Sequence, residues 1–144
     1  MSEAMLDRWS VGSEGPEFRV GPLTRTDIVR YAGAGGDFNP MHTDVVFARE
    51  HGAHDVFAQG HFTAGILARL VVDWFGLANL RTFQVRFSAR VWPGDVIVAT
   101  GRIVSVVPVE GGHLARCEIG AGRESNGDGE VVVFGSATAF IPFE

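Results

Sequence analysis

The sequence predicts an α+β fold in which an antiparallel sheet curls around one long helix. Two observations lead to this prediction. Apolar residues between Gly60 and Gly76 recur at three- and four-residue steps, as in a helix with one broad buried face. Four segments with the alternating pattern of β-strands follow, and tight turns join them. Strands joined by tight turns pair antiparallel, so one helix and one sheet account for most of the chain.

The composition is that of a single globular domain. The chain has 144 residues, of which 46% are hydrophobic and 20% are charged, and this length suits one domain spanning residues 1–144. The formal net charge of −5 argues against nucleic acid and anionic membrane as partners, because both attract a basic face. Single arginines at positions 81, 86, 90 and 102 are spaced as on the solvent faces of strands rather than as a phosphate-binding patch.

A cytoplasmic location is predicted. Cys117 is the only cysteine, so it cannot form an intramolecular disulfide, and a half-buried thiol in a reducing compartment fits. Residues 1–8 lack the apolar run of a secretory signal. The longest apolar stretch, residues 66–77, contains Arg69 and Asp73 and is too short to span a bilayer.

Four elements are predicted before the long helix: a loose lead-in over 1–12, a strand over 17–20, a helix from Thr24 to the glycines at 33–36, and a brief helix over 44–50. Thr24 and Asp27 have the spacing of a capping box, in which each side chain bonds the backbone N–H of the other. Residues 35–42 contain two glycines and Pro40, which interrupt regular structure, so we expect an ordered loop there.

Four strands are predicted after the long helix, over residues 83–91, 96–107, 113–123 and 130–143. The first strand alternates strictly, with an apolar face made of Phe83, Val85, Phe87, Ala89 and Val91. Turns are predicted at 93–95, 111–112 and 126–129, and the last of these is an Asn-Gly-Asp-Gly hairpin turn. This order of elements supports the single antiparallel sheet.

A carboxylate and an imidazole lie close together in the predicted loop, within the sequence GDFNPMH of residues 36–42. Asp37 and His42 are five residues apart, which places them on different faces of a helix or a strand, so only a bent loop can bring them together. The glycines and Pro40 can build such a bend. The same residue types are common in ordinary turns, and spacing alone favours that simpler interpretation.

Residues 31–48, YAGAGGDFNPMHTDVVFA, resemble the hydratase motif of the MaoC-like, (R)-specific enoyl-CoA hydratases. That pattern runs aromatic, small residues, Gly-Asp-x-Asn-Pro-x-His and then an alanine, and each of these positions is matched here. The resemblance continues through residues 58–60, the long helix and residues 85–87, so it covers most of the chain from Leu23 onward. The chain also resembles the dehydratase subunits of dissociated fatty-acid elongation systems.

The resemblance implies a hot-dog fold in which Asp37 and His42 hold a water above the double bond of the substrate. It also implies that Gly60 donates its N–H to the thioester carbonyl, at a helix start that favours negative charge. Asn39 is expected to support the loop by bonding backbone. The chain departs from the family at Gln59 and His61, because relatives usually carry His-Gly-Met where this sequence has Gln-Gly-His, so we expect these two residues to influence substrate binding.

The predicted activity is reversible hydration of a trans-2-enoyl thioester to the (R)-3-hydroxyacyl thioester, in fatty-acid or related acyl-chain metabolism. The resemblance implies no metal and no cofactor beyond the CoA or acyl carrier protein handle of the substrate. The acyl chain length, the handle, the direction, and which of Asp37 and His42 acts as acid or base stay open. We expect the volume beside Trp74 and His61 to define the acyl group.

Three alternatives remain. A hot-dog acyl-CoA thioesterase would also use a carboxylate and an ordered water. A metal-binding or accessory protein is suggested by the histidines at 42, 51, 54 and 61, although zinc needs three or four converging ligands and His51 and His54 are expected at the surface. The third alternative is a dehydratase subunit that needs a second hot-dog chain. Because sheet edges favour pairing, we expect a homodimer or a two-chain assembly.

Overall fold

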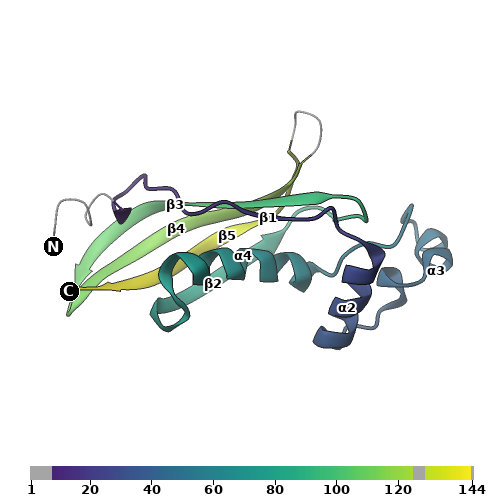
Figure 1. Cartoon of the computed structure of the whole chain (residues 1–144), viewed down its shortest axis with the longest axis horizontal. Helices are drawn as coiled ribbons and strands as arrows, with labels where there is room; N and C mark the ends of the chain where they lie inside the picture. The colour runs from purple at the N-terminus through teal and green to yellow at the C-terminus, as the bar shows by residue number, and fades with distance from the viewer. Residues whose placement is uncertain (1–7, 125–128, 144) are drawn as a thin grey trace.

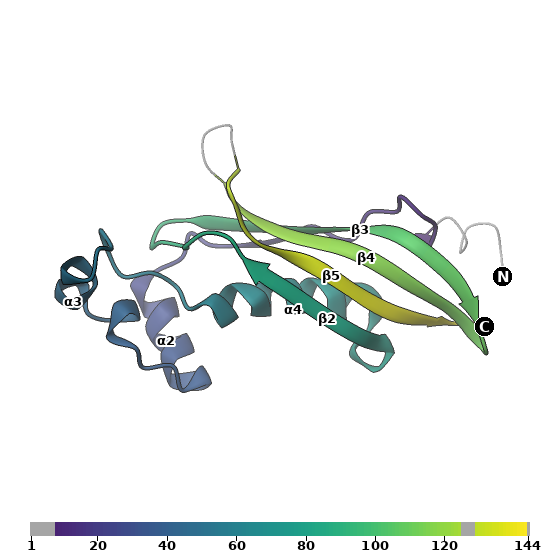
Figure 2. The same cartoon turned by 180° about the vertical axis from the view of Figure 1, so that it is seen from behind.

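The computed structural model describes residues 8–124 and 129–143, and it confirms the predicted α+β architecture. Five antiparallel strands form one sheet in the order β1-β3-β4-β5-β2. The strands are β1 (Phe18–Val20), β2 (Leu80–Phe87), β3 (Val96–Val109), β4 (Gly112–Glu124) and β5 (Val131–Pro142). Figures 1 and 2 show, from opposite sides, how this sheet curls over helix α4.

Helix α4 (Gly60–Phe75) packs its apolar face into the core beneath the sheet. The face has the predicted three- and four-residue steps, and its buried side chains are Thr63, Ala64, Ile66, Leu67, Leu70, Val71, Trp74 and Phe75. On the exposed side, Nε of Arg69 donates to the carboxylate of Asp73 one turn later, at 2.7 Å. The helix ends at Gly76, whose φ of 82° suits glycine. No helix in the described ranges is long and apolar enough to cross a membrane.

Three short helical segments lie beyond the N-terminal end of α4, as Figure 1 shows. They are α2 (Arg25–Gly35), the 3-10 turn η1 (Pro40–His42) and α3 (Val45–Glu50). The predicted capping box of α2 is present, because Thr24 and Asp27 each accept the backbone N–H of the other. The Thr24 hydroxyl also donates to the Asp27 carboxylate, which holds the pKa of Asp27 below its usual value. The predicted loop is therefore only partly irregular, since η1 lies within it.

The part of the lead-in that the structure describes, residues 8–12, is attached to the sheet, although the sequence predicts a loose segment. The N–H of Gly12 donates to the carbonyl of Ile103 at 2.8 Å, and Trp9 stacks on Phe75 with ring centroids 5.1 Å apart. The prediction was wrong for this part because backbone pairing of so short a segment leaves no side-chain periodicity in the sequence.

Strand β2 begins and ends earlier than the predicted strand over 83–91. Its first apolar side chains pack against the core as predicted, but Phe87 is 50% exposed. The Phe87 ring lies beside Gly60, the first residue of α4, so the helix covers only one side of it. Phe87 is therefore an exposed position within the predicted apolar face, since Ala89 and Val91 beyond it pack in the core again, and a strand pattern alone does not reveal this.

Strands β4 and β5 enclose Cys117, which is fully buried rather than half-buried. Its Sγ lies 3.5 Å from the carbonyl of Ala137, and burial raises the pKa of the thiol. The hairpin turn predicted over 126–129 lies largely outside the described residues.

Candidate active site

The loop after α2 is held by two side-chain contacts to its own backbone. The chain leaves the helix at Gly36, whose φ of 72° is left-handed. The carboxylate of Asp37 accepts the N–H of Asn39 at 3.3 Å, and the side-chain oxygen of Asn39 accepts the N–H of Met41 at 3.0 Å. The predicted supporting contact of Asn39 is thus present, and it starts η1, which carries His42.

His42 is buried, and its ring is oriented by a backbone carbonyl. Its Nδ1 lies 2.7 Å from the carbonyl oxygen of Phe57. A carbonyl oxygen only accepts, so Nδ1 carries the hydrogen and Nε2 is the acceptor nitrogen when the ring is neutral. The ring also meets the Phe57 ring edge-on, with centroids 5.1 Å apart. These contacts fix both the tautomer and the direction of Nε2.

Asp37 and His42 come together as predicted, with Oδ2 of Asp37 3.6 Å from Nε2 of His42. This separation is too long for a direct hydrogen bond, and both facing atoms accept when the imidazole is neutral. A water that donates one hydrogen to each atom satisfies both. The Asp37 side chain is 44% exposed and that of His42 only 9%, so the pair consists of a solvent-accessible carboxylate and a buried imidazole. The arrangement can hold and deprotonate one water molecule.

The segment 53–59 joins α3 to α4, and we call it the α3–α4 linker. Its Phe57 carbonyl binds His42, and three residues later Gly60 begins α4. N–H groups in the first turn of a helix have no acceptor within the helix, and the described residues offer none to the Gly60 N–H, so this group can bind a ligand. A side chain at position 60 would meet the Phe87 ring at 3.3 Å, so glycine leaves space there.

Gln59 and His61 lie on different sides of this helix start. Gln59 is fully buried, and its Nε2 donates to the carbonyl of Ile28 on α2 at 3.2 Å. Within the described ranges its Oε1 has no hydrogen-bond partner. His61 is exposed, and its ring meets Phe87 edge-on with centroids 6.0 Å apart. Gln59 therefore links α2 to α4, whereas His61 faces solvent beside the end of β2.

Replacing Gln59 with glutamate is expected to lower the free energy of unfolding at pH 7 by roughly 2–3 kcal/mol, because the new carboxylate would be buried opposite a carbonyl. The dipole at the start of α4 would stabilise the negative charge by only about 1 kcal/mol. Desolvation raises the pKa of such a carboxyl in the folded state, so the loss should disappear as pH falls below its unfolded value of about 4.3. Urea unfolding at pH 4 and pH 7 measures this.

The matched control is Gln84→Glu on the exposed side of β2, which should change stability little at either pH. An equal loss for Gln59→Glu at both pH values would show that the lost amide, rather than the buried charge, is responsible.

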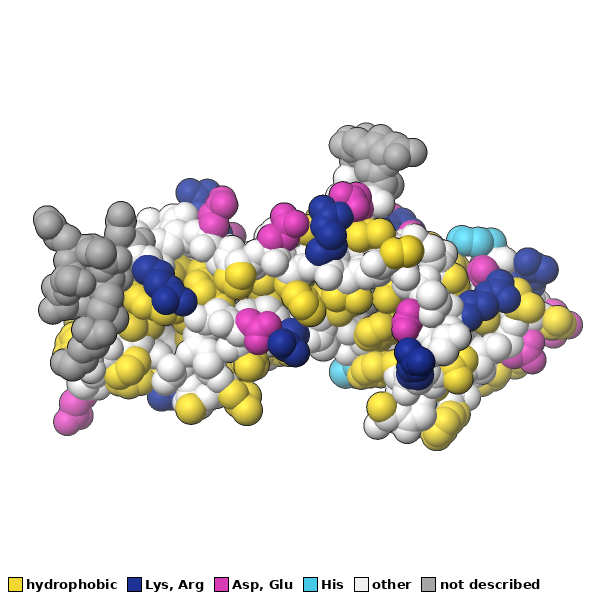
Figure 3. Space-filling model, viewed as in Figure 1, with side chains coloured by type: hydrophobic (Ala, Val, Ile, Leu, Met, Phe, Trp, Pro, Cys, Tyr) yellow, Lys and Arg dark blue, Asp and Glu magenta, His cyan; other side chains and the backbone are white. Residues whose placement is uncertain are grey.

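The prediction that the acyl group occupies a space beside both Trp74 and His61 is wrong. The two residues are thirteen positions apart on α4, which corresponds to about 20 Å along the helix axis, and Trp74 is packed against Gly15 and Gly101. A groove of about 520 Å³ lies instead near Phe62 and the stacked Tyr31 of α2. Figure 3 shows the surface hollowed between α2 and the start of α4.

The two histidines of the brief helix and linker have packing partners. His51 stacks on Phe47 with centroids 3.9 Å apart, and His54 packs against Trp92 in a tilted arrangement with centroids 3.8 Å apart. Both are exposed, as predicted. Among residues 8–124 and 129–143, no three histidine, cysteine or acidic side chains gather as metal ligands would.

Sequence reasoning missed the residues that surround the histidine of the pair. The Phe57 contact uses a backbone carbonyl, which leaves no residue-type signal. The Arg90 guanidinium lies over the Phe57 ring, 4.7 Å from its centroid, and Trp92 meets the same ring edge-on at 5.7 Å. Both follow β2 in a segment that reads only as a strand end, so their proximity to His42 comes from the fold.

One sheet wrapped around one helix, with the Asp37–His42 pair on the loop before that helix, defines a hot-dog protein, and structural neighbours confirm this predicted fold. The (R)-hydratase from A. caviae involved in PHA biosynthesis aligns with a TM-score of 0.77 at 19% identity, over 92% of this chain and 97% of that one. The ChsH1-ChsH2 complex from Mycobacterium tuberculosis aligns with a TM-score of 0.75 at 21% identity, over 93% and 98%.

Sequence comparison gives the family. The family model described as MaoC like domain matches residues 12–116, and the chain belongs to this family. The 3-hydroxyacyl-[acyl-carrier-protein] dehydratase FERN, mitochondrial, of Solanum lycopersicum is 28% identical over 116 residues, which cover 81% of this chain and 68% of that protein. The predicted family is confirmed, and so is the predicted hydro-lyase class, because dehydratases and hydratases are hydro-lyases.

Proposed function

We propose that the protein catalyses the reversible hydration of a trans-2-enoyl thioester to the (R)-3-hydroxyacyl thioester. The observation that carries this proposal is the 3.6 Å separation between Oδ2 of Asp37 and Nε2 of His42, where two proton acceptors face one small space. Membership of the MaoC-like domain family supports it. The reaction needs a base and an acid within hydrogen-bond reach of one water, and this pair supplies both functions.

In the hydration direction, the oxygen of the water adds to C3 and a proton must reach C2. A water that donates to Asp37 and His42 keeps its lone pairs free to attack the double bond. As the C3–O bond forms, one of the two groups takes a proton from the water and delivers it to C2. The other group holds the remaining O–H in place. Either group can take the first role, because both facing atoms are unprotonated when the imidazole is neutral.

Negative charge develops on the thioester oxygen during this step, and we propose that the Gly60 N–H stabilises it. A preorganised backbone donor at the start of a buried helix adds both a hydrogen bond and the positive end of the helix dipole. Supporting roles are proposed for Asn39, which starts η1, and for Gln59, which ties α4 to α2.

The active form is proposed to contain two hot-dog chains, as a homodimer or with a second chain of the same class. In the described sheet β1 and β2 are terminal strands, and unpaired backbone groups on a terminal strand favour association. The neighbour ChsH1-ChsH2 is itself a complex. A cytoplasmic location stays a prediction, and the tomato relative is named as mitochondrial.

The test follows the loss of enoyl absorbance with short-chain, long-chain and ring-bearing trans-2-enoyl thioesters, presented on CoA and on acyl carrier protein. The expected result is stereospecific conversion of at least one substrate to the (R)-3-hydroxyacyl product without added metal. Free thiol is measured in the same reactions, because a thioesterase would release it. An enzyme that releases thiol, or that is inert to every substrate even with a second hot-dog chain added, would contradict the proposal.

A further inference from the structure

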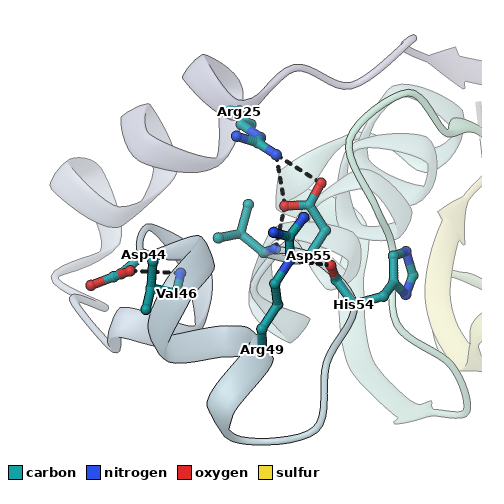
Figure 4. Close-up of polar contacts among 7 residues, drawn as sticks. Arg25, Asp44, Val46, Arg49, His54 and Asp55 are labelled. Carbon is teal, nitrogen blue, oxygen red and sulfur yellow. Dashed lines mark hydrogen bonds and ion pairs between the residues drawn. The ribbon is translucent and has the colours of Figure 1, made fainter.

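Three arginines from separate parts of the chain gather around the α3–α4 linker. Arg25 lies on α2, Arg49 on α3, and Arg90 follows β2. Figure 4 shows Arg25 and Arg49 extending from their two helices toward Asp55. The arginines are far apart in the sequence, so the linear pattern gives no sign of a basic patch in a chain whose formal charge is −5.

Two of these guanidinium groups are held through one nitrogen each, and their other N–H donors have no acceptor in the part of the chain that the structure describes. Nη2 of Arg25 donates to both carboxylate oxygens of Asp55, at 2.8 and 2.9 Å. Nε of Arg49 donates to the carbonyl of His54 at 3.1 Å. The hydrogen bond from Arg25 holds the pKa of Asp55 below its usual value, and the nearby charge of Arg49 lowers it further. One carboxylate therefore faces two guanidinium groups.

The terminal nitrogens of Arg49 have no hydrogen-bond acceptor within the residues that the structure describes, and the charge of Arg49 acts on Asp55 from beyond ion-pair distance. In the same described residues the guanidinium of Arg90 has no hydrogen-bond acceptor, and it lies over the face of the Phe57 ring. Asp44, labelled in Figure 4, caps α3 by accepting two backbone N–H groups of that helix and points away from Asp55. Three guanidinium groups around the single carboxylate of Asp55 leave an excess of positive charge, and several of their N–H donors have no acceptor among the described residues.

Aromatic contacts connect this cluster to the Asp37–His42 pair. Phe57, which packs against the His42 ring, lies under Arg90 and meets Trp92 edge-on. Trp92 in turn packs against the ring of His54, the residue whose carbonyl accepts from Arg49. The arginines are thus attached to the same short linker whose end, at Gly60, would bind the thioester carbonyl.

The spacing along the linker suits the handle of a thioester substrate. Asp55 precedes Gly60 by five residues, so their Cα atoms are at most about 18 Å apart. Because this is an upper limit, Asp55 lies no farther from Gly60 than about the span of a pantetheine arm, the chain with two amide groups between a thioester and its first phosphate. Guanidinium groups are the preferred protein ligands of phosphate, because their paired N–H donors match its oxygens.

We propose that Arg25, Arg49 and Arg90 bind the phosphate groups of a CoA thioester, which makes CoA the preferred handle of the substrate. The inference rests on the proposed hydratase function. Three guanidinium groups match the diphosphate and the 3′-phosphate of CoA, whereas a carrier-linked pantetheine bears a single phosphodiester. The site is therefore assigned to CoA rather than to acyl carrier protein.

The test compares one enoyl group on three handles: CoA, pantetheine without phosphate, and acyl carrier protein. In Arg49→Gln and Arg90→Gln, KM for the CoA substrate should rise about tenfold each, equivalent to about 1.4 kcal/mol, while kcat stays unchanged. KM for the pantetheine substrate should not move. Arg116→Gln, an exposed arginine on β4, is the matched control and should leave all three substrates unaffected.

A binding measurement separates this inference from the proposed activity. Adenosine 3′,5′-bisphosphate should bind the wild-type protein, by calorimetry, and bind the Arg49→Gln/Arg90→Gln double variant at least tenfold more weakly. If the pantetheine substrate is hydrated but the bisphosphate does not bind, or KM is equal for CoA and pantetheine, the phosphate site is wrong and the hydratase proposal stands. If the substitutions raise KM only for the carrier-linked substrate, the cluster serves a carrier protein and the CoA assignment is overturned. Bisphosphate binding without turnover of any enoyl thioester would support the site and contradict the hydratase proposal.

Discussion

Asp37→Asn is expected to lower kcat for hydration of a trans-2-enoyl thioester by roughly 10²- to 10⁴-fold. Asparagine has nearly the same shape and keeps an oxygen that can accept the N–H of Asn39, so the loop should survive. What is lost is the charge and basicity of the atom that faces Nε2 of His42 at 3.6 Å. Steady-state kinetics by enoyl absorbance measures the effect, with KM expected to change much less than kcat.

His42→Ala should cause a loss of similar size, and the double variant should be little worse than either single variant, because two groups that act on one water fail together. Asp73→Asn is the matched control: this carboxylate, on the exposed side of α4, has a side chain 43% exposed, against 44% for Asp37. Full activity in Asp37→Asn, or additive losses in the double variant, would contradict the shared-water mechanism.

The second large effect concerns stability. Leu67→Ala should lower the free energy of unfolding by about 2–5 kcal/mol, because Leu67 is fully buried in the core and the truncation leaves a cavity. A loss of this size is a large fraction of the total stability of a domain. Urea unfolding followed by tryptophan fluorescence gives the change in midpoint at constant slope.

Leu77→Ala provides the same chemical change at a residue that is 71% exposed, just after α4. It should change the free energy of unfolding by no more than about 0.5 kcal/mol. A loss for Leu67→Ala as small as that of Leu77→Ala would mean that α4 is not packed in the core of the protein in solution.

Most of the fold could be predicted from the sequence because side-chain periodicity records burial. The steps of α4, the alternation in β3 and β4 and the capping box of α2 all have direct sequence signals, and each is present in the structure. The exceptions are positions whose structure depends on backbone hydrogen bonds or on neighbouring elements rather than on side-chain periodicity. Residues around Gly12 pair with β3 through backbone groups, and Phe87 is exposed because α4 begins beside it.

The candidate site also has one part that the sequence predicts and one part that only the structure reveals. Asp37, Asn39 and His42 could be named because they fall in one short motif, and the structure brings Asp37 and His42 together with Asn39 supporting their loop. The gathering of Arg25, Arg49 and Arg90 could not be predicted, since their positions depend on how α2, α3 and the end of β2 meet. A site formed by residues close together in the sequence can be predicted from that sequence. A site formed by distant segments becomes visible only in the folded structure.

The contact between His42 and the Phe57 carbonyl has a consequence for protein engineering. The acceptor that fixes the imidazole tautomer belongs to the main chain, so every amino acid at position 57 retains it. A saturation library at this position can therefore change the side-chain packing against the His42 ring while the proton on Nδ1 keeps its partner. Position 57 is therefore a place where the surroundings of His42 can be varied without losing the acceptor that orients its ring.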